Sequence, residues 1–204
     1  MLVSEKWNVY SHLFGAILSL IGFTPLMYYA ISSDDFYRMI GIPIYGLCLI
    51  ILFSSSVLYH SSVGKKREYL QKLDHISIFL LISGTYTPYM LITLRDSSGF
   101  YILTTIWSIS AIGIVFKFFL AHKFDFLSTL LYLFCGWLII FDFGNFYNTY
   151  DRVGFYWLGA GGLAYSIGAV FFLWEKLPKN HEVWHVFVLL GSLFHYVAIL
   201  FYLV

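Results

Sequence analysis

Seven long apolar stretches alternate with short polar breaks along the 204 residues of the chain. Each stretch has roughly the 20 residues that an α-helix needs to cross the hydrocarbon core of a bilayer. The stretches cover residues 10–31, 39–60, 74–94, 100–120, 125–145, 154–174 and 182–204. This pattern predicts seven transmembrane helices joined by short loops.

Two alternatives to seven helices fit the pattern less well. The break around residues 121–123 is weak because Lys117 lies inside the preceding stretch, but fusing the two helices there would require about 45 unbroken residues, well beyond bilayer thickness. A closed β-barrel would require strict alternation over about ten residues per strand, whereas residues 47–53 and 130–141 are continuously apolar. We therefore predict an all-α membrane protein, a seven-transmembrane helix bundle that forms a single domain over residues 1–204.

The composition excludes an ordinary soluble domain. Only 11% of the residues are charged and 60% are hydrophobic, against roughly 25% charged residues in a typical globular chain. The formal net charge is +1, so nothing indicates electrostatic binding of nucleic acid. The two cysteines, Cys48 and Cys135, lie in separate apolar stretches and do not form a disulfide framework.

The distribution of positive charge predicts the orientation of the bundle in the membrane. With seven spans, nine of the twelve Lys and Arg residues fall on one side and three on the other. The richer side holds Lys6, Lys65, Lys66, Arg67, Lys72, Lys117, Lys123, Lys176 and Lys179. Because cytoplasmic loops carry the excess of positive charge, we expect a multi-pass protein of the cell (plasma or inner) membrane, with its amino terminus in the cytoplasm and its carboxyl terminus outside.

Titratable side chains gather at one level of the predicted bundle. His60 ends the second stretch, Asp74 begins the third, His181 and His185 begin the seventh, and His12 begins the first. All of these positions fall at the predicted cytoplasmic face. Ionisable residues in or beside a membrane span are costly and are therefore candidates for function.

The spacing of these residues predicts a metal site. His181 and His185 are four positions apart, which places their imidazoles side by side on one helical face, a common metal clamp. His60 would supply a third nitrogen. Three protein ligands and one open position form the catalytic arrangement of zinc, and Asp74 could act as general base toward a water molecule.

Ser56 precedes His60 by one helical turn and lies on the same face. Its hydroxyl could hydrogen-bond a water molecule at the metal or a substrate carbonyl. The structural alternative is a serine that satisfies a carbonyl of its own helix, which is frequent in membrane helices.

With these residues assembled, the chain resembles the hemolysin III branch of the progestin and adipoQ receptor family. The resemblance extends from Glu5 to about Tyr202, nearly the whole chain. Four segments carry it: residues 5–15 (EKWNVYSHLFG), residues 56–60 (SVLYH), Asp74 followed by residues 84–88 (GTYTP), and residues 181–188 (HEVWHVFV).

This resemblance implies a seven-helix bundle with one zinc near the cytoplasmic face. By the same resemblance, the zinc ligands are His60, His181 and His185, Asp74 matches the position that holds the zinc-bound water, and Ser56 is the serine of the shared Ser-x-x-x-His motif. The wider superfamily looks like membrane hydrolases that act on amide bonds of lipids, including ceramidases.

Other polar residues in the spans have structural interpretations. His12 would either hold a metal-binding residue in place without binding the metal itself, or serve as a capping or interface residue. His195 lies about 15 Å deeper than His185 by helical rise, and we interpret it as a hydrogen-bonding partner between helices. For Asp142 we expect a structural partner such as Arg38 or Arg152.

Three functions follow from these features. The leading hypothesis is a zinc-dependent membrane hydrolase that cleaves an amide bond, as in ceramide, or an ester bond of a membrane lipid. The second is a non-enzymatic, receptor-like protein that senses lipids or regulates the membrane, with a structural zinc. The third is a pore-forming hemolysin, which is disfavoured because the polar residues gather at one end of the bundle and do not line a pore. The sequence leaves the substrate and the oligomeric state open.

Overall fold

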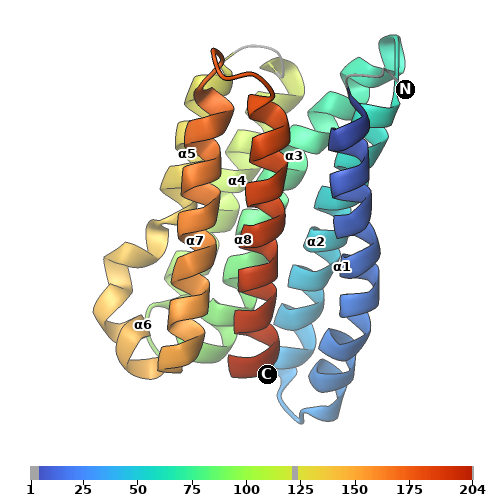
Figure 1. Cartoon of the computed structure of the whole chain (residues 1–204). Coiled ribbons are helices and arrows are strands. Elements are labelled where there is room, and N and C mark those ends of the chain that lie inside the picture. Colours follow the sequence, from blue (N-terminus) through green and yellow to red (C-terminus); the bar gives the residue numbers. More distant parts are fainter. Residues whose placement is uncertain (1–4, 121–123, 204) are drawn as a thin grey trace.

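The computed structural model describes residues 5–120 and 124–203, which form helices and no strands (Figure 1). The α-helices are α1 (Lys6–Ser32), α2 (Phe36–Ser61), α3 (Lys65–Pro88), α4 (Gly99–Leu120), α5 (Asp125–Gly136), α6 (Phe143–Thr149), α7 (Arg152–Leu173) and α8 (Asn180–Tyr202). Two short segments interrupt this series, a π-helical turn η2 (Tyr89–Thr93) and a 3-10 helix η3 (Leu138–Asp142).

Seven of these segments are long and apolar enough to cross a membrane. The third combines α3 with η2, and the fifth combines α5, η3 and α6. The predicted seven-helix bundle is therefore confirmed. The weak break at residues 121–123 lies outside the described residues, but α4 ends at Leu120 and α5 begins at Asp125, so the six-span alternative is not supported.

The third helix begins nine residues earlier than we predicted. Residues 65–68, interpreted from the sequence as part of a polar break, form the first turn of α3. Gly64 makes this early start possible, because it adopts a positive φ of 66° that other residues rarely tolerate. Glu68 also suits the first turn, where the helix dipole favours negative charge. As a result, Asp74 lies about two and a half turns inside α3.

The fifth span is broken, whereas the sequence predicted one continuous helix. α5 ends at Gly136, and the chain tightens into η3. The Tyr86 hydroxyl of α3 holds this break, because it donates a hydrogen bond to the Gly136 carbonyl (2.9 Å) and accepts one from the Ile139 amide (3.0 Å). A single side chain therefore satisfies two backbone groups that the interruption would otherwise leave unpaired.

The helices pack most extensively in three pairs, α1 with α2, α2 with α3, and α7 with α8. Figure 1 shows the two termini at opposite ends of the bundle. We call the end at which α1, α3, α5 and α8 begin the N-terminal end. Because α2 finishes at this end, the chain brings the last turn of α2 and the first turns of α1 and α8 to the same level. The orientation of this end in the membrane stays a prediction.

Candidate metal centre

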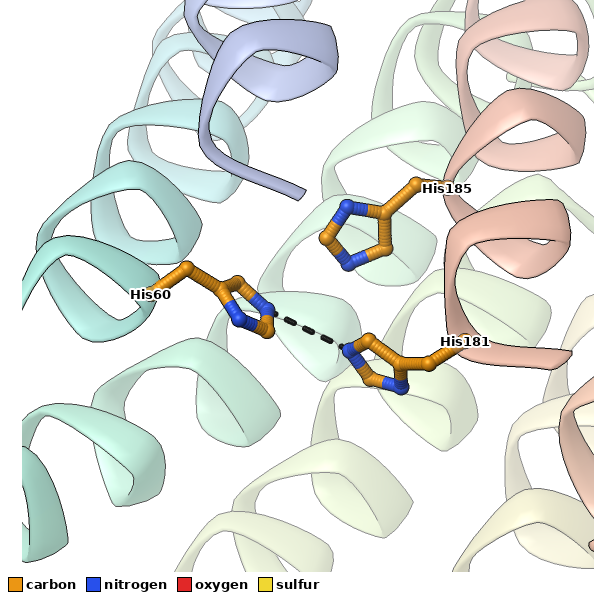
Figure 2. Close-up of side chains that lie close together, drawn as sticks. All are labelled: His60, His181 and His185. Carbon is orange, nitrogen blue, oxygen red and sulfur yellow. Dashed lines mark hydrogen bonds between the residues drawn. The ribbon is translucent and has the colours of Figure 1, made fainter. Parts of the chain in front are cut away.

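Three histidines from two helices converge at the N-terminal end of the bundle. His60 lies in the last turn of α2, and His181 and His185 lie in the first two turns of α8. The ring centroids are 4.7–5.0 Å apart in all three pairs, so the rings surround one common space (Figure 2). Each ring offers one nitrogen, and these three nitrogens lie within 4.8 Å of one another. The group could therefore hold a metal ion.

The closest pair of nitrogens matches the spacing that a metal requires. His60 Nε2 and His181 Nε2 are 3.2 Å apart. Two nitrogens bound to one tetrahedral zinc at about 2.0–2.1 Å would lie about 3.3 Å apart. The three imidazoles also suit zinc better than calcium or magnesium, which prefer oxygen ligands. The three imidazoles could therefore hold a metal ion, and one pair of their nitrogens already has the separation that tetrahedral zinc requires.

A carboxylate outside this group fixes the orientation of His60. Glu5 Oε2 lies 2.7 Å from His60 Nδ1, and Glu5 Oε1 accepts a hydrogen bond from Arg67 Nη2 at 2.6 Å. Because Nδ1–H donates to the carboxylate, Nε2 of the neutral ring is left with a lone pair that faces the other two histidines. This is the arrangement that orients metal-binding histidines in many proteins.

Glu5 is held in its charged form. Burial acts to raise its pKa, but hydrogen bonds from Asn8, His60 and Arg67 outweigh burial and lower the pKa to about 2. Our sequence analysis did not assign Glu5 this role. A signal was present, because Glu5, Asn8 and His12 are spaced by three and four residues and so share one face of α1.

His12 contacts the three-histidine group directly. Its ring stacks on His185 with centroids 3.6 Å apart and an interplanar angle of 14°. The side chain is buried, and neither ring nitrogen has a hydrogen-bond partner among the described residues. Ser11 Oγ lies 3.5 Å from His185 Nδ1. The structure thus places His12 against a candidate ligand by ring stacking, and its role in supporting that ligand stays a prediction.

Asp74 and Ser56 lie next to each other but are not members of the three-histidine group. The half-buried Asp74 carboxylate of α3 faces the Ser56 hydroxyl of α2. The hydroxyl is buried and makes no hydrogen bond of normal geometry to any described residue. The alternative in which Ser56 satisfies a carbonyl of its own helix is therefore wrong. The roles of Asp74 and Ser56 in chemistry stay predictions.

An apolar cavity leads from the candidate metal centre into the bundle. It lies among α3, α5, α7 and α8, and its lining extends from His181 to His195. A second apolar cavity shares part of this lining and continues past the break in the fifth span. The residues common to both are Thr85, Tyr86, Gly136, Trp137, Gly162 and His195. A path of low polarity therefore connects the three-histidine group with the middle of the bundle.

His195 and Asp142 both have structural partners within the bundle. His195 Nε2 of α8 donates a hydrogen bond to the Leu158 carbonyl of α7 at 3.2 Å, which confirms its role between helices. Asp142 has structural partners, as expected, but the arginines suggested for it are wrong. Its carboxylate instead accepts hydrogen bonds from the Ser98 hydroxyl and from Asn145 Nδ2.

Comparison with known proteins gives the family. The family model described as "Haemolysin-III related" matches residues 1–196. The chain belongs to the hemolysin III family. It is 44% identical to Hemolysin-3 of Bacillus cereus over 97% of this chain and 91% of that protein. It is 38% identical to the Hemolysin-3 homolog of Bacillus subtilis (strain 168) over 98% of this chain and 94% of that protein.

A human protein extends the relationship beyond bacteria. The monocyte to macrophage differentiation factor of Homo sapiens is 29% identical over 96% of this chain and 83% of the human protein. Together these relatives confirm the resemblance to the hemolysin III branch of the progestin and adipoQ receptor family. Members of the hemolysin III family are multi-pass membrane proteins, as the seven candidate spans require. No solved structure matches the chain.

Proposed function

We propose that this hemolysin III protein is a zinc-dependent membrane hydrolase that cleaves an amide or ester bond of a membrane lipid. The observation that carries the proposal is the convergence of three imidazoles beside an apolar cavity whose lining includes one of them. By the distribution of positive charge, we further propose that this end of the bundle faces the cytoplasm.

His60, His181 and His185 would hold the ion and leave one coordination position open, as in catalytic zinc sites. Zinc bound there would supply a Lewis acid that polarises a carbonyl and makes water a better nucleophile. Glu5 contributes by holding His60 with Nε2 directed at the site. The reaction then requires a group that accepts a proton and a group that stabilises an oxyanion.

Asp74 and Ser56 are the proposed groups for these two tasks. The Asp74 carboxylate would accept the proton from the attacking water and deliver it to the leaving amine or alcohol. The Ser56 hydroxyl, which faces this carboxylate, would donate a hydrogen bond to the developing oxyanion. Ser56 comes from α2, the helix that also carries His60, and Asp74 comes from the adjacent α3.

The cavity supports a lipid as the substrate class. Its wall is mostly apolar, and it begins at His181 and ends near His195, deep in the bundle. An acyl chain that entered from the bilayer would lie in this cavity with its polar linkage at the histidines. The preference for an amide, as in ceramide, rests on the family resemblance, and an ester is an equal candidate on chemical grounds.

Metal analysis of the purified protein tests the centre itself. We expect about one zinc per chain in the wild type and loss of the metal in His185→Ala. Zinc that binds the native protein should also raise its unfolding temperature, and a chelator should reverse this gain. Wild-type protein that contains no zinc and is not stabilised by added zinc would contradict the proposal.

A single substitution separates the enzyme from a lipid sensor with a structural zinc. In Asp74→Asn we expect retained zinc and at least a hundredfold loss of turnover of ceramide or an ester lipid, since a general base contributes roughly 10²–10⁴-fold. Asp96→Asn is the matched control, because Asp96 is almost fully exposed at the other end of the bundle. Unchanged turnover in Asp74→Asn, or full turnover by a His60→Ala, Asp74→Ala double variant, would overturn the enzymatic assignment.

A further inference from the structure

A hydrogen-bond acceptor faces the apolar cavity deep inside the bundle. His195 lines both cavities at the point where they meet. Its Nε2–H donates a hydrogen bond to the Leu158 carbonyl (3.2 Å), so Nδ1 of the neutral ring carries a lone pair. Nδ1 makes no hydrogen bond to any described residue, and the side chain that carries it lines both cavities.

The ring of His195 is held rigidly in this position. Gly161 of α7 lies against it so closely that a Cβ atom there would overlap the ring. Tyr165 packs on it edge-on, with ring centroids 5.3 Å apart. Together with the bond to Leu158, these contacts leave the imidazole little freedom to turn Nδ1 away from the cavity.

The neighbouring polar groups of the cavity are already paired with each other. Tyr165 OH and Ser192 Oγ are 2.8 Å apart, and Trp137 Nε1 donates to Ser166 Oγ at 3.0 Å. The Tyr86 hydroxyl is occupied by the backbone of the fifth span. His195 Nδ1 differs from these groups because it takes part in no hydrogen bond to any described residue, whereas each of these hydroxyls already takes part in one. An acceptor without a donor in apolar surroundings is unfavourable.

We propose that His195 recognises a hydroxyl group partway along the hydrocarbon chain of a lipid bound in this cavity. A hydroxyl is the hydrogen-bond donor that an aliphatic chain can carry to this depth. Nδ1 favours a chain with such a hydroxyl, because Nδ1 stays unpaired in its apolar surroundings when the chain has none. His181 and His195 are fourteen residues apart on α8, about 20 Å by helical rise. A lipid whose linkage lies at the histidines would thus present to Nδ1 a hydroxyl in the far half of an 18-carbon chain, and not one near the linkage.

This inference rests on the proposed lipid occupancy of the cavity, and it specifies which lipid is preferred. Its test uses binding of free fatty acids, so it requires no turnover. Affinities of stearate and of stearate with a hydroxyl near its methyl end are measured on the purified protein by calorimetry. For the wild type we expect about fivefold tighter binding of the hydroxylated chain, the worth of one typical hydrogen bond.

The preference should vanish in His195→Phe, which keeps an aromatic ring but removes Nδ1 together with the Nε2–H bond to Leu158. Tyr165→Phe is the matched control, because it also removes one hydrogen bond from the same cavity, and it should keep the preference. Zinc content should be unchanged in both variants. If His195→Phe does not fold, a wild-type comparison of hydroxyl positions replaces it, and a hydroxyl beside the carboxylate should then bring no gain over stearate.

The binding measurements distinguish the role of His195 from the lipid occupancy of the cavity. Equal affinity of the wild type for both chains overturns the role of His195 while lipid occupancy of the cavity stands. A preference that survives in His195→Phe, or that is the same for every hydroxyl position, also overturns it. No binding of either chain overturns the lipid cavity of the proposed function and this inference together, whereas the metal analysis above decides the three-histidine centre independently.

Discussion

The carboxylate of Glu5 holds His60 by a 2.7 Å contact between Oε2 and Nδ1, fifty-five residues away in the chain. The same carboxylate receives Arg67 through its other oxygen. The residue that caps the start of α1 is thereby tied to the last turn of α2 and the first turn of α3. This carboxylate decides which nitrogen of His60 is available to a metal.

Removing the charge of Glu5 should weaken metal binding. We expect Glu5→Gln to lower zinc affinity about 10- to 100-fold, since outer partners of metal-bound histidines have effects of this size. Competition with a zinc indicator measures the affinity. Glu68→Gln is the control, because Glu68 is exposed in the first turn of α3, and it should leave the affinity unchanged. Equal affinities for wild type and Glu5→Gln would show that the carboxylate does not act on the metal.

The close approach of α7 and α8 at Gly161 should not tolerate a methyl group. Gly161→Ala would place Cβ inside the His195 ring and should destabilise the fold by about 1–3 kcal/mol, the usual cost of overpacking. Gly159→Ala, two residues earlier on α7, meets open space and should be neutral or slightly stabilising. Unfolding temperatures of the two variants in the same detergent give the comparison. Equal stabilities would show that the two helices can separate here without cost.

The break in the fifth span should depend on one hydroxyl. Tyr86→Phe removes the partner of both the Gly136 carbonyl and the Ile139 amide, and we expect a loss of about 1–3 kcal/mol because buried backbone groups are left unpaired. Tyr101→Phe is the control, because Tyr101 is 80% exposed. Thermal unfolding measures both. A Tyr86→Phe variant as stable as the wild type would mean that the break between α5 and η3 satisfies its backbone hydrogen bonds without the Tyr86 hydroxyl.

The cap of α2 should make stability depend on pH. Slight burial acts to raise the pKa of Asp35, but hydrogen bonds from the Tyr37 and Arg38 amides, and the charge of Arg95, lower it. The carboxylate therefore stabilises the fold above its ordinary pKa near 4, and this contribution is lost as the pH falls through the lowered value.

We expect Asp35→Asn to unfold at a temperature that falls less between pH 5 and pH 3 than that of the wild type. Asparagine caps a helix about as well as aspartate, so the difference isolates the charge. Asp34→Asn, at the exposed neighbouring position, should follow the wild type. If the pH profile of Asp35→Asn coincides with that of the wild type, the capping charge contributes no pH dependence.

The number and type of the spans could be predicted from the sequence because they depend on local composition. A stretch of about 20 apolar residues has no stable alternative to a helix in a bilayer, whatever its neighbours are. The pair His181 and His185 could be predicted for the same reason, since helical periodicity alone places residues four apart on one face. His60 could be added because helix direction sets the depth of each residue.

The contacts between helices were decided by the tertiary structure. Depth does not determine how a helix is rotated about its axis, so the sequence could place Asp142 at the correct level and still assign it the wrong partners. The early start of α3 brings Arg67 to Glu5, and the break at Gly136 depends on a tyrosine fifty residues earlier. The sequence by itself determined which residues lie at each level of the membrane, because this follows from helical rise. Which of them touch was decided only by packing, because side-chain contacts depend on the rotation and exact ends of several helices at once.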